Sequence, residues 1–255
     1  MSLNLTIDQG NTAAKLGLWR DGELMAVCVE EHPTPERVEG FARSLGDVPN
    51  AALYCSVACR GDNLLHDIRR YIPVVRRLKA DMPLPLKIGY GTPGSLGTDR
   101  IAAAAGAMTL HPGKPLLVVD AGTAVTYDYV RSDGTFVGGN IAPGMTMRLE
   151  ALHRFTVRLP KLEMPRDLEP GHLFGTDTTS AMTHGAAYGI IGSIVFYRNH
   201  LPDDTVTVVT GGWANLISRL IEIDVDLEPH LVSRGLNSIL NYNEHIRQQQ
   251  PALRY

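Results

Sequence analysis

The chain has few cysteines, no long apolar run and no excess of positive charge. Three cysteines in 255 residues, Cys28, Cys55 and Cys59, are too few and too scattered for a disulfide framework, which favours a reducing compartment. No stretch approaches the roughly 20 apolar residues of a membrane span, and the amino terminus lacks the pattern of a secretory signal. The net charge of −3 argues against a nucleic-acid binder with a broad basic surface. We therefore expect a cytoplasmic protein that binds neither membrane nor nucleic acid.

Several common signatures of catalysis and cofactor binding are also missing. The P-loop pattern G-x-x-x-x-G-K-[ST] and the esterase pattern G-x-S-x-G do not occur. The nine histidines show no metal-ligand spacing, and Cys55 and Cys59 have no partner pair nearby, so a zinc site is not expected. Residues 89–94 fit the G-x-G-x-x-G pattern of dinucleotide binders. In a dinucleotide-dependent oxidoreductase the helix would begin directly at the last glycine of this pattern, whereas here Pro93 and residues 95–97 place its start later in the sequence.

Short apolar runs alternate with segments of helical period, and this alternation predicts an α/β fold. The composition, 44% apolar and 20% charged, is that of an ordinary folded protein. Strands are expected at residues 3–7, 14–19, 24–29, 51–57, 86–90, 115–119 and 205–209. Helices are expected after Thr34 as N-cap, and at residues 63–71, 98–110 and 231–243.

The two halves of the chain echo each other. The first reads LNLTIDQGNTAAKLGLWRDGELMAVCV and the second PLLVVDAGTAVTYDYVRSDGTFVGGNI. In each, an apolar strand ends in an aspartate, and a small-residue turn, a second strand, an Asp-Gly turn and a third strand follow. Asp8 precedes Asp21 by the spacing that separates Asp120 from Asp133. We expect two similar domains, residues 1–113 and 114–255; the alternative is chance similarity, because Asp-Gly is common in hairpins.

The repeated turns carry a chemistry of their own. Glycine lets successive backbone N–H groups point at one anion, and Thr12 and Thr123 add hydroxyl donors. Asp8 and Asp120, each at the end of a strand, are suited to holding a hydrated Mg²⁺ against phosphate oxygens, and Lys15 adds a cation. A facing pair of such turns would grip the phosphates of a nucleotide. The alternative is an ordinary hairpin turn with Asx-type hydrogen bonds.

Residues 97–100, Gly-Thr-Asp-Arg, begin a helix after a glycine-rich loop. Thr98 or Asp99 is suited to being the N-cap of that helix. In the functional alternative, Asp99 accepts a proton from a substrate hydroxyl and Arg100 orients an anionic group by forked hydrogen bonding. Two further glycine turns, residues 138–144 and 210–212, suit either the flanking of an adenine or ribose or close strand–helix packing.

The order and spacing of these motifs resemble those of type III pantothenate kinases, members of the acetate and sugar kinase, heat-shock chaperone and actin superfamily. The resemblance runs nearly from end to end. It rests on residues 8–15 (DQGNTAAK), Tyr90 before 97–100 (GTDR), 120–124 (DAGTA), 138–144 (GGNIAPG), 159–160 (LP), 177–185 (DTTSAMTHG), 210–212 (TGG) and a last helix containing Gly235-Leu236.

The resemblance implies two actin-like (ribonuclease H-like) domains, each a mixed central sheet flanked by helices, with a cleft between them. It implies ATP-dependent phosphorylation of the primary hydroxyl of pantothenate to 4'-phosphopantothenate, the first step of coenzyme A synthesis. Mg²⁺ and a monovalent cation, K⁺ or NH₄⁺, would be required. The protein would be a homodimer in which the partner subunit helps to close the pantothenate pocket.

The resemblance also assigns roles to single residues. Asp99 would be the general base, Asp120 would hold the monovalent cation, and Asp8 would contact Mg²⁺ through water. ATP would be bound by Asp8, Gln9, Gly10, Asn11, Thr12, Ala13, Ala14, Lys15 and Thr123. Pantothenate would be bound by Tyr90, Gly97, Thr98, Asp99, Arg100 and Thr179. Gln9 stands where an aliphatic residue is commoner, which puts the Mg²⁺ shell in doubt, and Asp177 stands where asparagine is frequent.

Two other functions are compatible with the same motifs. A kinase of this superfamily that acts on a sugar or small acid differs only in its acceptor. A non-catalytic accessory or regulatory protein tends to lose its carboxylates, whereas Asp8, Asp99 and Asp120 are all present.

Overall fold

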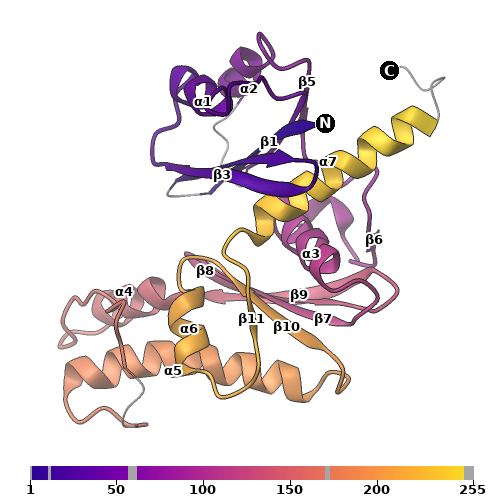
Figure 1. Cartoon of the computed structure of the whole chain (residues 1–255). Coiled ribbons are helices and arrows are strands. Elements are labelled where there is room, and N and C mark those ends of the chain that lie inside the picture. The colour runs from indigo at the N-terminus through magenta and orange to yellow at the C-terminus, as the bar shows by residue number, and fades with distance from the viewer. Residues whose placement is uncertain (1, 11–12, 57–61, 170–172, 250–255) are drawn as a thin grey trace. The chain divides into compact units, whose positions relative to one another are not determined.

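The computed structural model describes residues 2–10, 13–56, 62–169 and 173–249. Its contacts divide the chain into unit 1, Met1–Pro112 with His230–Tyr255, and unit 2, Gly113–Pro229 (Figure 1). The first boundary lies beside the expected one, but the expected second domain, residues 114–255, also took in the last helix. That helix packs with unit 1, so the chain returns to its first unit at the end.

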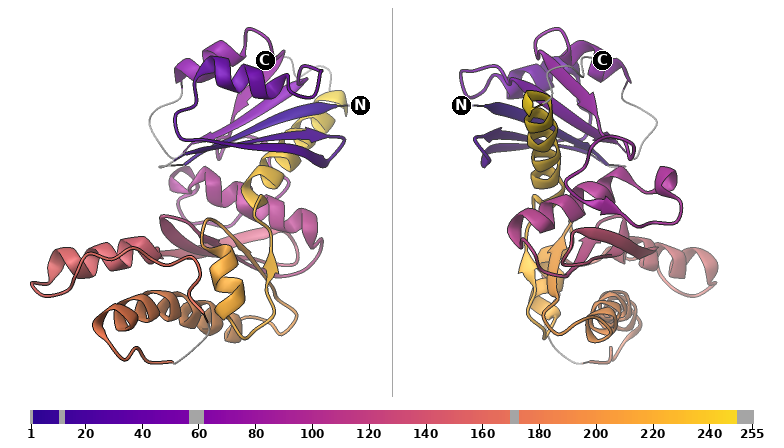
Figure 2. Two further views of the ribbon diagram at one scale, coloured as in Figure 1. Left: turned by 60° about the vertical axis from the view of Figure 1, so that its left-hand side comes forward. Right: turned by 90° about the vertical axis from the view of Figure 1, so that its right-hand side faces the viewer.

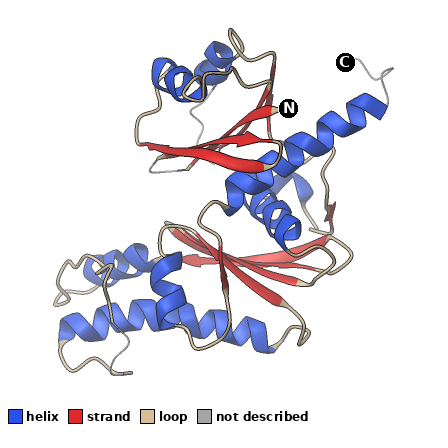
Figure 3. Ribbon diagram, in the orientation of Figure 1, coloured by secondary structure: helices blue, strands red, loops and turns tan. Residues whose placement is uncertain are grey.

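Unit 1 is a mixed sheet with helices on both faces. Its strands lie in the order β3-β2-β1-β4-β5, with β1 antiparallel to β2 and parallel to β4. Figure 3 shows the alternation of strands and helices. The strands of this sheet are β1 (Leu3–Gln9), β2 (Ala14–Arg20), β3 (Glu23–Glu30), β4 (Ala51–Ser56) and β5 (Val74–Arg77), and the short β6 (Lys87–Ile88) is not part of it. The helices are α1 (Pro35–Ala42), α2 (Asp62–Ile68), the 3₁₀ turn η1 (Pro93–Ser95), α3 (Thr98–Leu110) and α7 (Leu231–Gln249).

The alternation of side chains along β1 decides which helix covers which face. Leu3, Leu5 and Ile7 join the apolar core with side chains of α1 and α2. Asn4 and Thr6 point to the other face, where Asn4 hydrogen-bonds Asn237 and Thr6 hydrogen-bonds Ser233 of α7. Both views of Figure 2 show α1 and α2 on one side of this sheet and α7 on the other.

Two glycines bring α3 and α7 into close contact. A Cβ on Gly106 would lie 2.3 Å from the Leu231 carbonyl oxygen, and a Cβ on Gly235 would lie 1.7 Å from that of Ala102. Only glycine permits this approach of two helix backbones.

Unit 2 repeats the strand arrangement of unit 1, in the order β9-β8-β7-β10-β11. Again the first strand of the meander pairs antiparallel with the second and parallel with a later strand. The elements are β7 (Leu116–Ala121), β8 (Ala124–Val130), β9 (Thr135–Pro143), α4 (Met145–Phe155), α5 (Thr178–Asn199), β10 (Val206–Thr210), α6 (Ala214–Leu220) and β11 (Asp226–Leu227). Because strand order and direction match, the expected duplication and the fold class are confirmed.

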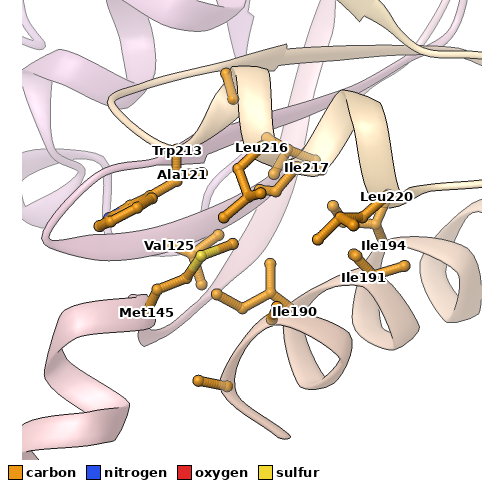
Figure 4. Close-up of a cluster of buried hydrophobic side chains, with 14 of the residues drawn as sticks. Ala121, Val125, Met145, Ile190, Ile191, Ile194, Trp213, Leu216, Ile217 and Leu220 are labelled. Atoms are coloured by element: carbon orange, nitrogen blue, oxygen red, sulfur yellow. The ribbon is translucent and has the colours of Figure 1, made fainter. Parts of the chain in front are cut away.

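The core of unit 2 lies between its sheet and helices α4, α5 and α6. Ala121 and Val125 from the sheet meet Met145, Ile190 and Ile217 from the three helices (Figure 4). As in unit 1, every second residue of the first strand faces this core, so Asp120 lies on the opposite face from Ala121.

The structure confirms some of the turns and helix caps expected from the sequence and corrects others. Asp21 and Gly22 both have positive φ, 50° and 92°, as a tight hairpin of two right-twisted strands requires. Thr34 is the N-cap of α1 and accepts from the Arg37 N–H. The expected caps at Thr98 and Asp99 are wrong, because Gly97 is the N-cap of α3. In the described part of the chain, no helix is long and apolar enough to cross a membrane.

Candidate active site

The expected site residues of unit 1 begin at the carboxyl ends of β1 and β4. These two parallel strands pair Asp8 with Cys55. Both residues follow the alternation of Thr6 on β1, so they lie on the face that carries α7 rather than on the face of α1 and α2. On the other side of β1, Asp8 pairs with Lys15 of β2, which puts a carboxylate and an ammonium group on the same face.

Helix α3 starts at this end of the sheet. The Cys55 Sγ lies 3.1 Å from the Thr98 Oγ1, so the first residue of α3 is hydrogen-bonded to the end of β4. The next residue is Asp99, whose Oδ1 accepts from the Arg100 N–H at 2.9 Å. A Cβ on Gly97 would lie 2.5 Å from that same oxygen, so glycine leaves the room that the carboxylate takes.

The electrostatics of Cys55 bring the two aspartates into one neighbourhood. Burial is the main reason that the pKa of the Cys55 thiol lies above its usual value, and the Asp8 carboxylate raises it further. The hydrogen bond to Thr98 lowers this pKa, Asp99 raises it and Arg77 lowers it. Asp8 is the cross-strand neighbour of Cys55, and Asp99 follows Thr98, its hydrogen-bond partner, so both carboxylates lie near this sulfur atom.

Cys55 is a residue that the sequence analysis did not place at the site. Arg77, at the end of β5, pairs with its neighbour Tyr54, and its guanidinium carbon lies 5.9 Å from the centroid of the Tyr54 ring. Tyr54 belongs to the core on the α1 and α2 face, so Arg77 lies on the other face of the sheet from Cys55. The signal for Cys55 in the sequence was position alone, since it lies near the end of a strand that runs parallel to β1.

Tyr90 and Arg100, two of the expected pantothenate ligands, also lie together. The guanidinium carbon of Arg100 is 5.7 Å from the centroid of the Tyr90 ring, a cation–π arrangement. Arg100 is only 6% exposed. The Tyr90 loop therefore meets the start of α3, although β6 covers only Lys87–Ile88 of the expected strand, and η1 intervenes before α3.

The turn after β1 is described in part. The Gly10 N–H donates to the Ala13 carbonyl at 3.0 Å, and Gln9 Nε2 donates to the Gly10 carbonyl. Ala14 starts β2. The other two expected ATP ligands in this turn, Asn11 and Thr12, lie outside the described residues.

In unit 2, Asp120 occupies the position that Asp8 has in unit 1. It pairs with Thr126 on the antiparallel side and with Thr210 on the parallel side. Gly211 has a φ of +94°, and a Cβ there would lie 2.5 Å from the Asp120 Oδ1. The missing Cβ lets the Asp120 carboxylate lie against the backbone of this turn.

Thr123 lies in the turn between β7 and β8. Its carbonyl accepts from the Gly144 N–H at 3.1 Å, and the Gly122 N–H donates to the Ala124 carbonyl at 3.0 Å. A Cβ on Gly144 would lie 2.4 Å from the Thr123 carbonyl oxygen. The glycine of the 138–144 motif thus serves close packing against this turn.

Thr179, the last expected pantothenate ligand, is exposed in the first turn of α5 in unit 2. Asp177 is the N-cap of that helix, and its Oδ1 accepts from the N–H groups of Thr179 and Ser180. The Asp177 N–H in turn donates to the Ser180 Oγ at 3.2 Å, which completes a capping box. Aspartate at this position therefore has a structural reason of its own.

No cluster of three or more histidine, cysteine, aspartate and glutamate side chains suitable for a metal occurs among the described residues. Asp8 and Asp120 act as single carboxylates in separate units. Mg²⁺ often uses only one or two protein carboxylates and takes its other ligands from water and phosphate, so single carboxylates fit its chemistry.

A cavity of about 310 Å³ lies elsewhere in unit 1, between α1 and α2. Charged side chains of both signs line it, among them Glu39, Arg43 and Asp67, and Arg43 pairs with Glu39 at 2.8 Å. None of the expected site residues lines it.

The chain is similar to known proteins along most of its length. The family model described as type III pantothenate kinase matches residues 4–199. The chain is 36% identical to a type III pantothenate kinase of Porphyromonas gingivalis over 250 residues, which cover 95% of this chain and all of that protein. A second relative of the same name, from Phocaeicola vulgatus, is 33% identical over 255 residues, or 96% of this chain and all of that protein.

Solved structures show the likeness of fold. A Campylobacter jejuni protein described as a conserved Baf family transcriptional activator superposes with a TM-score of 0.61 at 20% identity, over 94% of this chain and 99% of its own. At that identity the comparison speaks for the fold alone.

Proposed function

The chain belongs to the type III pantothenate kinase family, and from that premise we propose which of its residues carry out the reaction. The enzyme is a phosphotransferase that uses ATP to phosphorylate pantothenate in coenzyme A biosynthesis. The observation that carries our assignment is the position of Asp99 at the start of α3, beside the ends of β1 and β4.

Asp99 is the proposed general base. Phosphoryl transfer passes through a loose transition state, so the enzyme chiefly positions the acceptor hydroxyl in line and neutralises charge. A carboxylate in the first turn of a helix, with one oxygen held by the Arg100 N–H, has a fixed orientation from which to accept the hydroxyl proton.

Residues 8–15 are the proposed phosphate-binding segment of unit 1. Asp8 would hold Mg²⁺ through water, and Lys15, its cross-strand neighbour, would contribute a cation to the phosphates. In unit 2, Thr123 would contact ATP. Asp120, whose carboxylate lies against the Gly211 turn, would hold the monovalent cation.

The acceptor site is assigned to Tyr90, residues 97–100 and Thr179. Pantothenate carries a carboxylate, and Arg100 offers a planar fork of donors for such a group. Its guanidinium already packs on the Tyr90 ring, so little side-chain entropy remains to be lost on binding.

We also propose a homodimer in the cytoplasm. Large apolar side chains are exposed on unit 2, among them Phe155 at 85%, Phe174 at 78% and Phe196 at 57%, and such surfaces are typical of protein interfaces. Cys28 and Cys55 are free thiols, which fits a reducing compartment.

The test is a coupled assay of ADP release with and without pantothenate and K⁺, run beside a panel of sugars and small hydroxy acids. We expect Asp99→Asn to fold normally and to lose about 10²–10⁴-fold in kcat, the usual contribution of a positioned base. Asp81→Asn, an exposed carboxylate of the same unit, is the matched control and should keep full activity.

Two results would contradict the assignment. Near wild-type turnover of Asp99→Asn would remove Asp99 as the base. ADP release that responds to a sugar and not to pantothenate would identify a different acceptor for this chain.

A further inference from the structure

Cys55 is completely buried where β4 approaches the start of α3. Its sulfur is 3.1 Å from the Thr98 Oγ1, and its cross-strand neighbour on β1 is Asp8. The thiol therefore connects the phosphate-binding strand pair with the helix that carries Asp99.

Among the described residues, no side chain caps the start of helix α3. Its N-cap is Gly97, which has no side chain to cap the helix, and the Ile101 N–H bonds the Gly97 carbonyl at 3.2 Å. Farther along α3, Gly106 fixes the helix against α7. With that part held by backbone contact, a hydrogen bond at Thr98 sets the direction in which the first turn points.

We propose that Cys55 is a positioning residue for phosphoryl transfer, whose thiol holds Thr98 and thereby the first turn of α3 in register with the end of β1. The inference rests on the proposed function, because it gives Thr98 and Asp99 their roles toward pantothenate. Cys55 itself touches neither substrate in this scheme and acts through Thr98.

On replacement, a side chain that only fills space in the core would behave differently from a positioning residue. If the sulfur only filled space, its loss would lower stability and leave the ratio of the two substrates' kinetic constants unchanged. A positioning residue changes the acceptor side selectively, because Thr98 and Asp99 serve pantothenate whereas residues 8–15 serve ATP.

The first experiment compares Cys55→Ala with Cys55→Ser, using steady-state kinetics with each substrate varied. We expect Cys55→Ala to lower kcat/KM for pantothenate about threefold to tenfold, as the loss of one hydrogen bond does. KM for ATP should stay within about twofold of wild type, a smaller change than the loss of one such hydrogen bond causes. Cys55→Ser restores a hydroxyl that can bond Thr98 and should recover at least half of the loss. Cys28→Ala, the other free thiol described, is the matched control and should leave kinetics unchanged.

The second experiment is a double-mutant cycle with Thr98→Val, which removes the same hydrogen bond from the other side. In a Thr98→Val background, Cys55→Ala should lower kcat/KM for pantothenate further by less than about twofold, because coupled residues are not additive. The same cycle on urea-induced unfolding reports the coupling of the two side chains without any substrate.

The inference is overturned if Cys55→Ala leaves kcat/KM for pantothenate unchanged, if Cys55→Ser is no better than Cys55→Ala, or if the full loss persists in the Thr98→Val background. If the cycle shows coupling of Cys55 and Thr98 in unfolding but the wild-type protein releases no ADP with pantothenate, the proposed function is refuted instead.

Discussion

Replacement of Gly235 by alanine perturbs the contact on which the position of α3 depends. The added Cβ would lie 1.7 Å from the carbonyl oxygen of Ala102 and 2.6 Å from its carbonyl carbon. Close contacts of carbon with carbonyl oxygen are about 3.3–3.6 Å, so α3 and α7 must separate by more than 1 Å locally. The obstacle is helix backbone, which cannot rotate aside as a side chain can.

The expected cost is large for one methyl group. Overpacking a core costs typically about 1–3 kcal/mol and occasionally more. Because two backbones must part along a shared contact that also includes Gly106, we expect a loss of about 3 kcal/mol or more, at or above the top of that range. Such a loss is a considerable share of a total stability of about 5–15 kcal/mol. Turnover should fall as well, since α3 carries Asp99.

Tryptophan fluorescence during urea unfolding can follow this contact directly. The chain has two tryptophans, and Trp19 Nε1 donates to the Ser233 Oγ of α7 at 3.0 Å. In a Trp213→Phe background, Trp19 alone reports on the docking of α7.

The matched control is Gly192→Ala in the exposed part of α5, where no described atom lies within 4 Å of the added Cβ. This variant should gain up to about 1 kcal/mol from helix propensity. If Gly235→Ala unfolded within about 0.5 kcal/mol of wild type, the ordinary range for a surface substitution, the described approach of α3 and α7 would be refuted.

Two further predictions concern unit 2. The pKa of Asp177 lies below its usual value, mainly because the Ser180 N–H bonds its carboxylate. The ionised carboxylate therefore stabilises the folded protein fully above an unfolded-state pKa of about 3.9, and this stabilisation disappears as pH falls through the lower folded-state pKa. The melting-temperature difference between wild type and Asp177→Asn should therefore shrink as pH falls from neutral to about 2, and a constant difference would contradict this. Gly211→Ala should destabilise unit 2 by about 1–2 kcal/mol through its positive φ and, by displacing the Asp120 carboxylate, raise the K⁺ concentration needed for half-maximal activity. Gly212→Ala, whose Cβ meets no described atom within 4 Å, is the control and should have neither effect.

Local pattern was enough to predict most of the fold. The strand from residue 3 to 7 was recognisable because apolar and polar side chains alternate along it, and the Asp-Gly turns because only few residues accept positive φ. The equal spacing of Asp8–Asp21 and Asp120–Asp133 predicted the duplication, which the matching strand orders confirm.

The return of α7 to unit 1 could not be predicted in this way. Its buried face includes Ser233, Asn237 and Asn243, and each of these polar side chains has a hydrogen-bond partner distant in the sequence. Asn237, for example, accepts from Asn4, 233 positions away. A pattern of hydrophobicity contains no information about such partners, so a boundary near Gly113 was the simplest division.

The pairing of Asp8 with Cys55 was beyond sequence analysis for a related reason. Parallel strands 47 residues apart can pair in many registers, and one step along β4 would bring Ser56 or Tyr54 beside Asp8. The sequence analysis considered Cys55 only for a disulfide framework and for a zinc site with Cys59, and expected neither. Its actual neighbours, Thr98 and Asp8, come from two other elements of the same unit.

The duplication explains why the two aspartates need not share one role. Asp8 and Asp120 have the same position in two sheets of the same order, yet their parallel neighbours differ, Cys55 in unit 1 and Thr210 in unit 2. In unit 1 the neighbouring strand holds the helix that begins with Thr98. In unit 2 it turns at Gly211, against whose backbone the Asp120 carboxylate lies. The surroundings of the two aspartates thus differ because of the residues next to each of them rather than because of the fold they share.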